Sequence, residues 1–113
     1  MSSAFKQFMA APDRPIILRG DYLKATLAAY KDFAQLLARN AENVRTGQAR
    51  DAVLAQKLSR LENYDIAIDQ TPSSYIVQIG PTVRGPEDAI FGGGARYVID
   101  RASFTIKDKT YLK

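Results

Sequence analysis

Residues 63–79 of this chain read NYDIAIDQTPSSYIVQI, and this stretch decides the fold class. Large apolar residues alternate with small or acidic ones along 64–69, and a period of two predicts a strand with one buried side. Residues 70–74 have the composition of a turn, and a second strand follows at 75–79. A turn this short cannot make a parallel crossover, so the two strands are expected to pair antiparallel.

Two more strands are predicted towards the C-terminus. Residues 96–100 and 104–107 are rich in β-branched and aromatic residues, and a turn is expected at 100–103. Together the four segments predict an antiparallel meander. Its buried side is expected to carry Tyr64, Ile66, Ile68, Val77, Ile79, Tyr97 and Ile99.

A long helix is predicted over residues 21–46, with Asp21 as its N-cap and Gly47 after its end. Its apolar residues recur at spacings of four and three, and they form one stripe: Leu23, Leu27, Tyr30, Ala34, Leu37, Ala41 and Val44. The stripe is either the seam of a coiled-coil dimer or the side of one helix that covers the sheet. The second interpretation is favoured, because the sheet needs an apolar cover and a seam of three heptads with two alanines is short.

Two shorter helices are predicted over residues 2–10 and 48–61. The sequence therefore predicts one α+β domain spanning residues 1–113. N-terminal helices, one of them long, form its helical part at 1–62, and they pack on a four-stranded antiparallel meander at 63–113.

The composition excludes several functional classes. Among 113 residues there is no cysteine and no histidine, which excludes disulfides, thiolate metal sites and Ser-His-Asp or Cys-His catalysis. No apolar run reaches the ~20 residues of a membrane-spanning helix. The net charge of +4 lies on residues 1–62 and is typical of a solvated helical surface, so nucleic-acid binding is disfavoured. The location is expected to be periplasmic if a signal peptide has been removed and cytoplasmic otherwise, and the oligomeric state is left open.

Two motifs could carry chemistry. Asp65 and Asp69 share one side of a strand, but at ~3.3 Å per residue they are expected to lie ~13 Å apart, too far to share a substrate atom. Gly92-Gly93-Gly94 could hold a phosphate, but a strand follows it instead of the Lys-Ser/Thr and helix of a P-loop. No catalytic residue, metal ligand or cofactor is predicted, and carboxylate-only catalysis is the remaining route to an enzyme.

The connection at residues 80–94 is longer than a hairpin needs, and such connections are uncommon without a functional reason. It offers a polar rim around two large apolar residues, an arrangement that suits an anchored protein contact. The predicted partner-binding residues are Arg84, Glu87, Asp88, Ile90 and Phe91. The other interpretation places Ile90 and Phe91 in the core as a cap.

The run GGGARYVIDRASFTI at residues 92–106 is similar to a strand-turn-strand ending in which glycines precede a Tyr-x-Ile-Asp-x-x-Thr/Ser hairpin. Over residues 62–107 the chain resembles cystatin-like and nuclear-transport-factor-2-like small bacterial α+β proteins, including immunity proteins. The resemblance implies a non-catalytic inhibitor-type protein that binds a protein partner such as a toxin or effector, and it carries over no functional residue. The alternative function is a small-ligand-binding domain, with its pocket between the long helix and the sheet.

Overall fold

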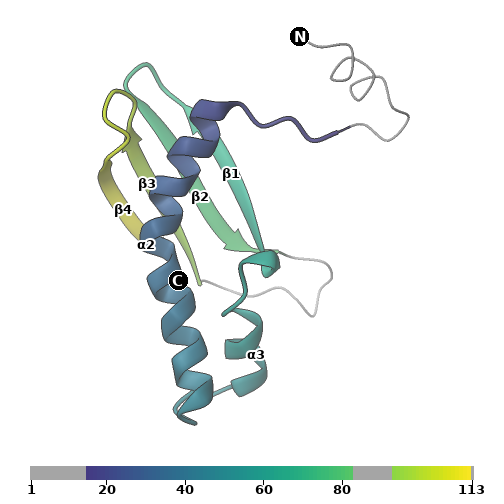
Figure 1. Cartoon of the computed structure of the whole chain (residues 1–113). Coiled ribbons are helices and arrows are strands. Elements are labelled where there is room, and N and C mark those ends of the chain that lie inside the picture. The colour runs from purple at the N-terminus through teal and green to yellow at the C-terminus, as the bar shows by residue number, and fades with distance from the viewer. Residues whose placement is uncertain (1–14, 83–92, 113) are drawn as a thin grey trace.

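A computed structural model describes residues 15–82 and 93–112 of the chain. Helix α2 (Gly20–Arg45) comes first, followed by the short helix α3 (Ala52–Lys57) and a 3-10 turn, η1 (Leu61–Asn63). Four strands follow: β1 (Tyr64–Gln70), β2 (Ser74–Pro81), β3 (Gly94–Asp100) and β4 (Ile106–Leu112). One long helix beside an antiparallel sheet confirms the predicted α+β class (Figure 1). The helix predicted at residues 2–10 lies outside the described residues.

The four strands form one sheet in the order β1-β2-β3-β4. Every pair is antiparallel, and each strand pairs with its neighbour in the sequence, which confirms the meander. Ile66 lies opposite Ile79, and Val77 lies opposite Tyr97, so the predicted alternation is in register across three strands. Strands β1 and β4 form the two edges of the sheet.

The fourth strand was predicted over residues 104–107, and this placement is wrong. The Asp100 carboxylate accepts hydrogen bonds from the backbone N–H groups of Ala102 and Ser103, which closes a tight turn. Phe104 then has a φ of 57°, which keeps it out of the strand. The strand therefore begins at Ile106, and its Lys-Asp-Lys segment hides it from a search for apolar residues.

The helix predicted over 48–61 is also wrong in extent. Helix α2 ends at Arg45, and Gly47 has a φ of 73°, in the left-handed region that favours glycine. The Asp51 side chain then accepts a hydrogen bond from the Leu54 N–H over 3.0 Å and caps a new helix. These turns limit α3 to six residues.

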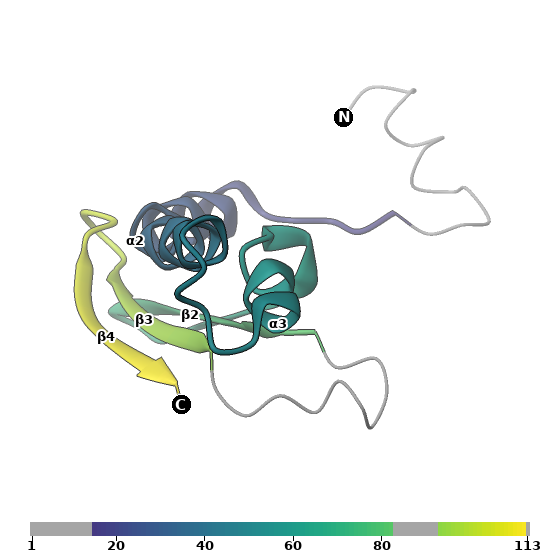
Figure 2. The same ribbon diagram turned by 90° about the horizontal axis from the view of Figure 1, so that it is seen from below.

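Helix α2 lies across one side of the sheet, and no other described element covers the opposite side (Figure 2). Its buried residues are spaced by four and are Ala25, Ala29, Phe33 and Leu37. They join the buried residues of the sheet in one core, namely Tyr64, Tyr75, Val77, Ile79, Ala95, Tyr97 and Ile99. A helix packed on a sheet buries the apolar side of both elements.

The predicted stripe is wrong as the sheet-covering side of α2. Leu23 is 46% exposed and Leu27 is 55% exposed, and Leu37 alone of the seven stripe residues is buried. Small residues face the sheet instead, because Ala25 and Ala29 let the helix backbone come close to the strands. The large apolar residues of the stripe are therefore left on the flank of the helix.

The buried residues of β2 and β3 follow the prediction, but in β1 only Tyr64 does. Ile66 is 40% exposed and Ile68 is only half-buried, although both lie on the same side of the sheet as Tyr64. The reason is the position of α2, which contacts β2 and β3 (Figure 1). Most of β1 is consequently without a helix above it.

Two aspartates attach α2 to the sheet. Asp21 accepts a hydrogen bond from the Tyr75 hydroxyl over 2.7 Å, and the Arg19 guanidinium donates two hydrogen bonds to it. Asp32, about three turns further along α2, accepts a hydrogen bond from the Tyr97 hydroxyl over 2.9 Å. Each tyrosine thus buries its ring in the core and satisfies its hydroxyl at the edge of the helix.

Candidate functional site

The predicted partner-binding residues, Arg84, Glu87, Asp88, Ile90 and Phe91, lie outside the described residues, and their role stays a prediction. The structure does describe where their connection meets the sheet. The Thr82 N–H donates to the Asn63 carbonyl and the Gly93 N–H donates to the Leu112 carbonyl, both over 2.9 Å. Strand β2 extends to Pro81 and β3 starts at Gly94, so the connection between the strands is shorter than predicted.

Gly94 has a structural role at this point. A Cβ atom on Gly94 would lie 2.4 Å from the backbone oxygen of Ile79, which is closer than atoms can approach. The glycine is therefore needed where β3 meets β2, as expected for a glycine at a strand entrance.

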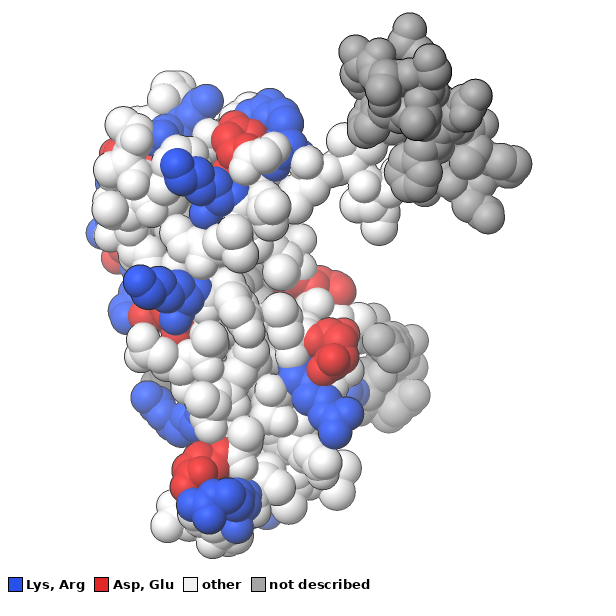
Figure 3. All heavy atoms as spheres, viewed as in Figure 1, with Lys and Arg blue, Asp and Glu red and all other residues white. Residues whose placement is uncertain are grey.

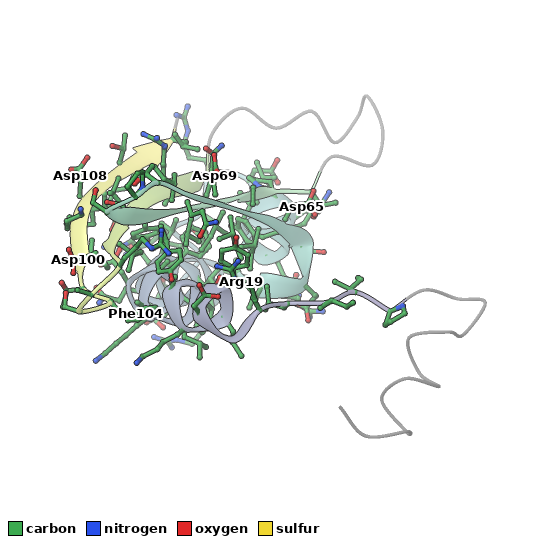
Figure 4. The ribbon with its side chains drawn as sticks, turned by 90° about the horizontal axis from the view of Figure 1, so that it is seen from above. Arg19, Asp65, Asp69, Asp100, Phe104 and Asp108 are labelled. Atoms are coloured by element: carbon green, nitrogen blue, oxygen red, sulfur yellow. The ribbon has the colours of Figure 1, made fainter. Side chains whose placement is uncertain are left out.

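Asp65 and Asp69 are both exposed, and they lie on the side of the sheet away from α2 (Figure 4). Asp65 accepts a hydrogen bond from the Thr82 hydroxyl over 2.7 Å. Within residues 15–82 and 93–112, no group of three or more carboxylates is placed to hold a metal ion. This part of the chain shows no sign of a catalytic centre.

The most distinctive surface is an apolar one beside α2 and β1. It consists of six large apolar residues with substantial exposure, which we call the apolar face: Ile16, Ile17, Leu18, Leu23, Leu27 and Ile66. The first three belong to the connector before α2, the next two to α2 and the last to β1.

Two contacts place helix α2 beside strand β1. At one end, Arg19 donates a hydrogen bond to the Gln70 side chain over 3.2 Å, and at the other the rings of Phe33 and Tyr64 meet at 5.1 Å. Helix α2 therefore runs antiparallel to β1, with its start beside the end of that strand and its middle beside the strand's beginning. The connector leaves α2 on the same side (Figures 1 and 2).

The rotation of α2 decides which of its residues belong to this surface. Asp32 contacts Lys109 and Tyr111 of β4, so its flank of the helix faces β4. At 3.6 residues per turn, Leu23 and Leu27 lie on the opposite flank of the helix, the one on the β1 side. The stripe predicted from the sequence is thus turned away from the core and towards solvent.

Charge is absent from the apolar face itself. Figure 3 shows an uncharged band over the side of α2 that faces the viewer, with basic residues along one margin and mixed charges near α3 on the other. The nearest guanidinium, that of Arg19, is paired with Asp21, and it also lies over the Tyr22 ring at 4.2 Å. The surface therefore suits an apolar partner rather than an ionic one.

A pocket of about 300 Å³ lies on the other flank of α2, between the helix and the β3–β4 end of the sheet. Its lining residues are Gln35, Leu36, Arg39, Gly93, Gly94, Tyr111 and Leu112. Among the described residues, the Arg39 guanidinium has no hydrogen-bond or ion-pair partner. In the same residues every buried side-chain nitrogen or oxygen does have a partner, so no buried polar group is left to receive a ligand.

Sequence reasoning missed the apolar face because it assigned the helix stripe to the core. The signal that could have identified it was the fourfold spacing of Ala25, Ala29 and Phe33, a second and less hydrophobic line on the same helix. It also passed over Ile16, Ile17 and Leu18 as an ordinary connector.

No described helix is long and apolar enough to cross a membrane. No protein-family model, no curated protein and no solved structure matches this chain.

Proposed function

We propose that this protein is a non-catalytic protein-binding domain and that it binds its partner through the apolar face. The observation that supports this is the exposure of six large apolar side chains on α2, on the connector before it and on the edge strand β1. From their exposed fractions the surface measures on the order of 600 Å², the upper end of the largest patches on monomeric proteins, and such patches are often functional.

The absence of histidine and cysteine supports a non-catalytic role. The resemblance to immunity proteins adds a toxin or effector as a further partner, one for the connection at residues 80–94. The prediction for Arg84, Glu87, Asp88, Ile90 and Phe91 is compatible with the proposal, because their connection leaves the sheet next to Tyr64, at one end of β1.

The test is capture of a partner by the full chain, compared between two variants. Leu27→Asp places a charge in the apolar face and is expected to abolish capture. Val53→Asp is the matched control, because Val53 is 81% exposed on α3, outside the apolar face. A partner captured equally by the wild type and by both variants would contradict the proposal, and so would loss of capture with Val53→Asp alone.

A second candidate function is binding of a small organic anion in the pocket beside Arg39. The unpaired guanidinium, the Gln35 amide and the apolar side chains of Leu36 and Leu112 suit a carboxylate with an apolar body. Benzoate is expected to raise the melting temperature where benzamide does not, and Arg39→Gln is expected to remove the rise. Arg50→Gln, elsewhere on the surface, is the control. Equal shifts with benzoate and benzamide would contradict this function.

A further inference from the structure

The spacing of the helix stripe is not explained by the sheet. Alternating steps of four and three, from Leu23 to Val44, are typical of a helix that packs along another helix. In the structure a different line, Ala25, Ala29, Phe33 and Leu37, covers the strands. The stripe therefore has the spacing of a helix that packs on another helix, but no described helix lies along its N-terminal half.

The C-terminal half of the stripe already has a neighbour. Helix α3 packs against this part of α2, and the Asn40 side chain donates a hydrogen bond to the Leu58 carbonyl over 3.1 Å. The N-terminal half is open, with Leu23 and Leu27 exposed and Ala34 partly so. A second helix can thus lie along about three turns of α2, where Ala34 allows a close approach.

The apolar face carries no charge that would oppose self-pairing. In a two-fold symmetric pair the same surface meets itself, so a charged residue near the axis would lie close to its own copy. The apolar face contains no charged residue, and Arg19 at its edge is neutralised by Asp21. Within the apolar face a second copy therefore brings no like charges together, while Lys24 and Lys31, on the flank of α2 beside Leu27, would lie across from each other at the solvent-exposed margin of the pair.

The area is also sufficient. A stable interface buries about 800 Å² on each partner, and about 65% of this is apolar in homodimers. The six residues of the apolar face together expose on the order of 600 Å², which is close to the apolar share that such an interface buries.

The free edge of β1 is a poorer contact between two copies. If two β1 strands paired antiparallel over all seven residues, Asp65 of one copy would lie opposite Asp69 of the other. Like charges directly opposite each other destabilise a strand pair. Pairing through the edge is thus disfavoured in this register, while pairing through the apolar face is not.

We infer that the partner bound by the apolar face is a second copy of this chain, in a two-fold dimer whose two α2 helices pack antiparallel along Leu23, Leu27, Tyr30 and Ala34. The inference rests on the proposed function, since it names the occupant of the same surface. Leu27 lies near the middle of the contact, and Ile66 and the connector residues close over the partner helix.

The first measurement is sedimentation equilibrium of the full chain from about 1 to 200 µM, the range in which modest dimers dissociate. The wild type is expected to reach twice the monomer mass of 12.5 kDa. Leu27→Asp is expected to weaken the dimer at least ~30-fold, the effect of losing a central contact residue. Val53→Asp is expected to leave it unchanged, and Leu23→Lys serves as a second disrupting variant if Leu27→Asp does not fold.

The second measurement locates the two-fold axis. Because the chain has no cysteine, single cysteines can be introduced one at a time at Leu23, Leu27, Tyr30 and Ala34 and oxidised. In an antiparallel pair only the residue near the axis meets its own copy, so cross-linking is expected to peak at one of these positions. Cysteine at Val53 is expected to give no cross-link. Equal cross-linking at Val53 and at the stripe would overturn the inference.

A wild-type chain that stays monomeric at every concentration would overturn the inferred dimer but would not contradict the proposed function. Capture of another protein that is lost with Leu27→Asp would then still support protein binding by the apolar face. If the wild type is monomeric and Phe8→Ser makes it bind a hydrophobic dye, the chain's own N-terminal residues occupy the surface, and the dimer is again contradicted.

Discussion

The hydroxyl of Tyr97, whose side chain is completely buried in β3, donates a hydrogen bond to the Asp32 carboxylate of α2 over 2.9 Å. The Tyr111 hydroxyl donates to the same carboxylate oxygen, and Lys109 donates to the other one. Donors from two neighbouring strands therefore converge on one helix residue, and they fix the rotation of α2 on the sheet. Lys109, followed by the two tyrosines, lowers the pKa of Asp32, while partial burial opposes them.

Removing this carboxylate is expected to destabilise the fold. Asp32→Ala leaves the Tyr97 hydroxyl without its acceptor in a partly buried position, at a cost of about 1–3 kcal/mol in the free energy of unfolding. Urea denaturation measures the change. Asp108→Ala, on the opposite side of the sheet (Figure 4), is the control and should change stability by less than ~0.5 kcal/mol. Equal losses for the two variants would show that Asp32 does not anchor the helix.

The two leucines of α2 provide a matched pair for the core. Leu37 is 7% exposed and belongs to the core, so Leu37→Ala is expected to cost ~2–5 kcal/mol. Leu27 is on the exposed flank, and Leu27→Ala should cost no more than ~0.5 kcal/mol in the monomer. The sequence alone predicts a large cost for both. Denaturation midpoints at a low protein concentration distinguish the expectation from the structure from the one based on the sequence. A large loss of stability with Leu27→Ala would show that Leu27 does pack on the sheet.

Gly94 and Gly80 test the close approach of β3 to β2. In Gly94→Ala the new Cβ would overlap the Ile79 backbone oxygen, so we expect a loss of about 1–3 kcal/mol from local displacement of the strand. In Gly80→Ala the new Cβ meets nothing within 4 Å, and stability should be nearly unchanged. If the thermal melts of the two variants coincide, the close approach is not present in solution.

Stability should fall at both ends of the pH scale. The pKa values of Asp21 and Asp32 are lowered in the folded protein, so below about pH 4 the unfolded chain binds protons first and the fold loses stability. Burial raises the pKa of Tyr64 to about 12. The unfolded chain therefore releases tyrosine protons first above about pH 10, and stability falls again. Urea midpoints across the pH range test this, and Asp32→Asn should flatten the acid side and also reduce part of the alkaline fall, because the pKa of Tyr97 is raised by burial and then by the Asp32 carboxylate.

Phe91 tests the connection between β2 and β3. If it docks a partner, Phe91→Ala should leave stability within ~0.5 kcal/mol and weaken partner binding by more than ~2 kcal/mol. If it caps the core instead, the same change should cost ~3–5 kcal/mol. A single thermal melt distinguishes the two, and a large drop in the midpoint would rule out docking at Phe91.

The order and type of the elements could be read from the sequence because they depend on local patterns. The alternation around Ile66 and the glycine after α2 are properties of neighbouring residues, and the structure confirms the strand and the helix end that they predict. The limits of β4 were missed because its charged residues follow a turn that depends on the Asp100 side chain.

The rotation of α2 could not be read in the same way, because it is set by partners distant in the sequence. The tyrosines of β2 and β3 reach the helix at Asp21 and Asp32, and these hydroxyl contacts select the flank that faces the sheet. Hydrophobicity alone favours Leu23 and Leu27 over Ala25 at the core. The apolar face is a consequence of this rotation of α2, and a search for periodicity in the sequence could not predict it.

The order of the elements along the chain has a consequence for folding during synthesis. Because α2 precedes the whole sheet, its core-facing line is complete at Arg45, while β3, which supplies Tyr97, is complete only at Asp100. A ribosome adding ~5–20 residues per second needs several seconds for that interval. Until β1 and β2 have been made, Phe33 and Leu37 have no strands to cover them, and their cover stays incomplete until β3 has been made. The stripe on the flank of the helix is exposed during the same interval. The nascent chain therefore emerges as an amphipathic helix with two exposed apolar surfaces, and we expect it to be a ligand for ribosome-associated chaperones until β3 arrives.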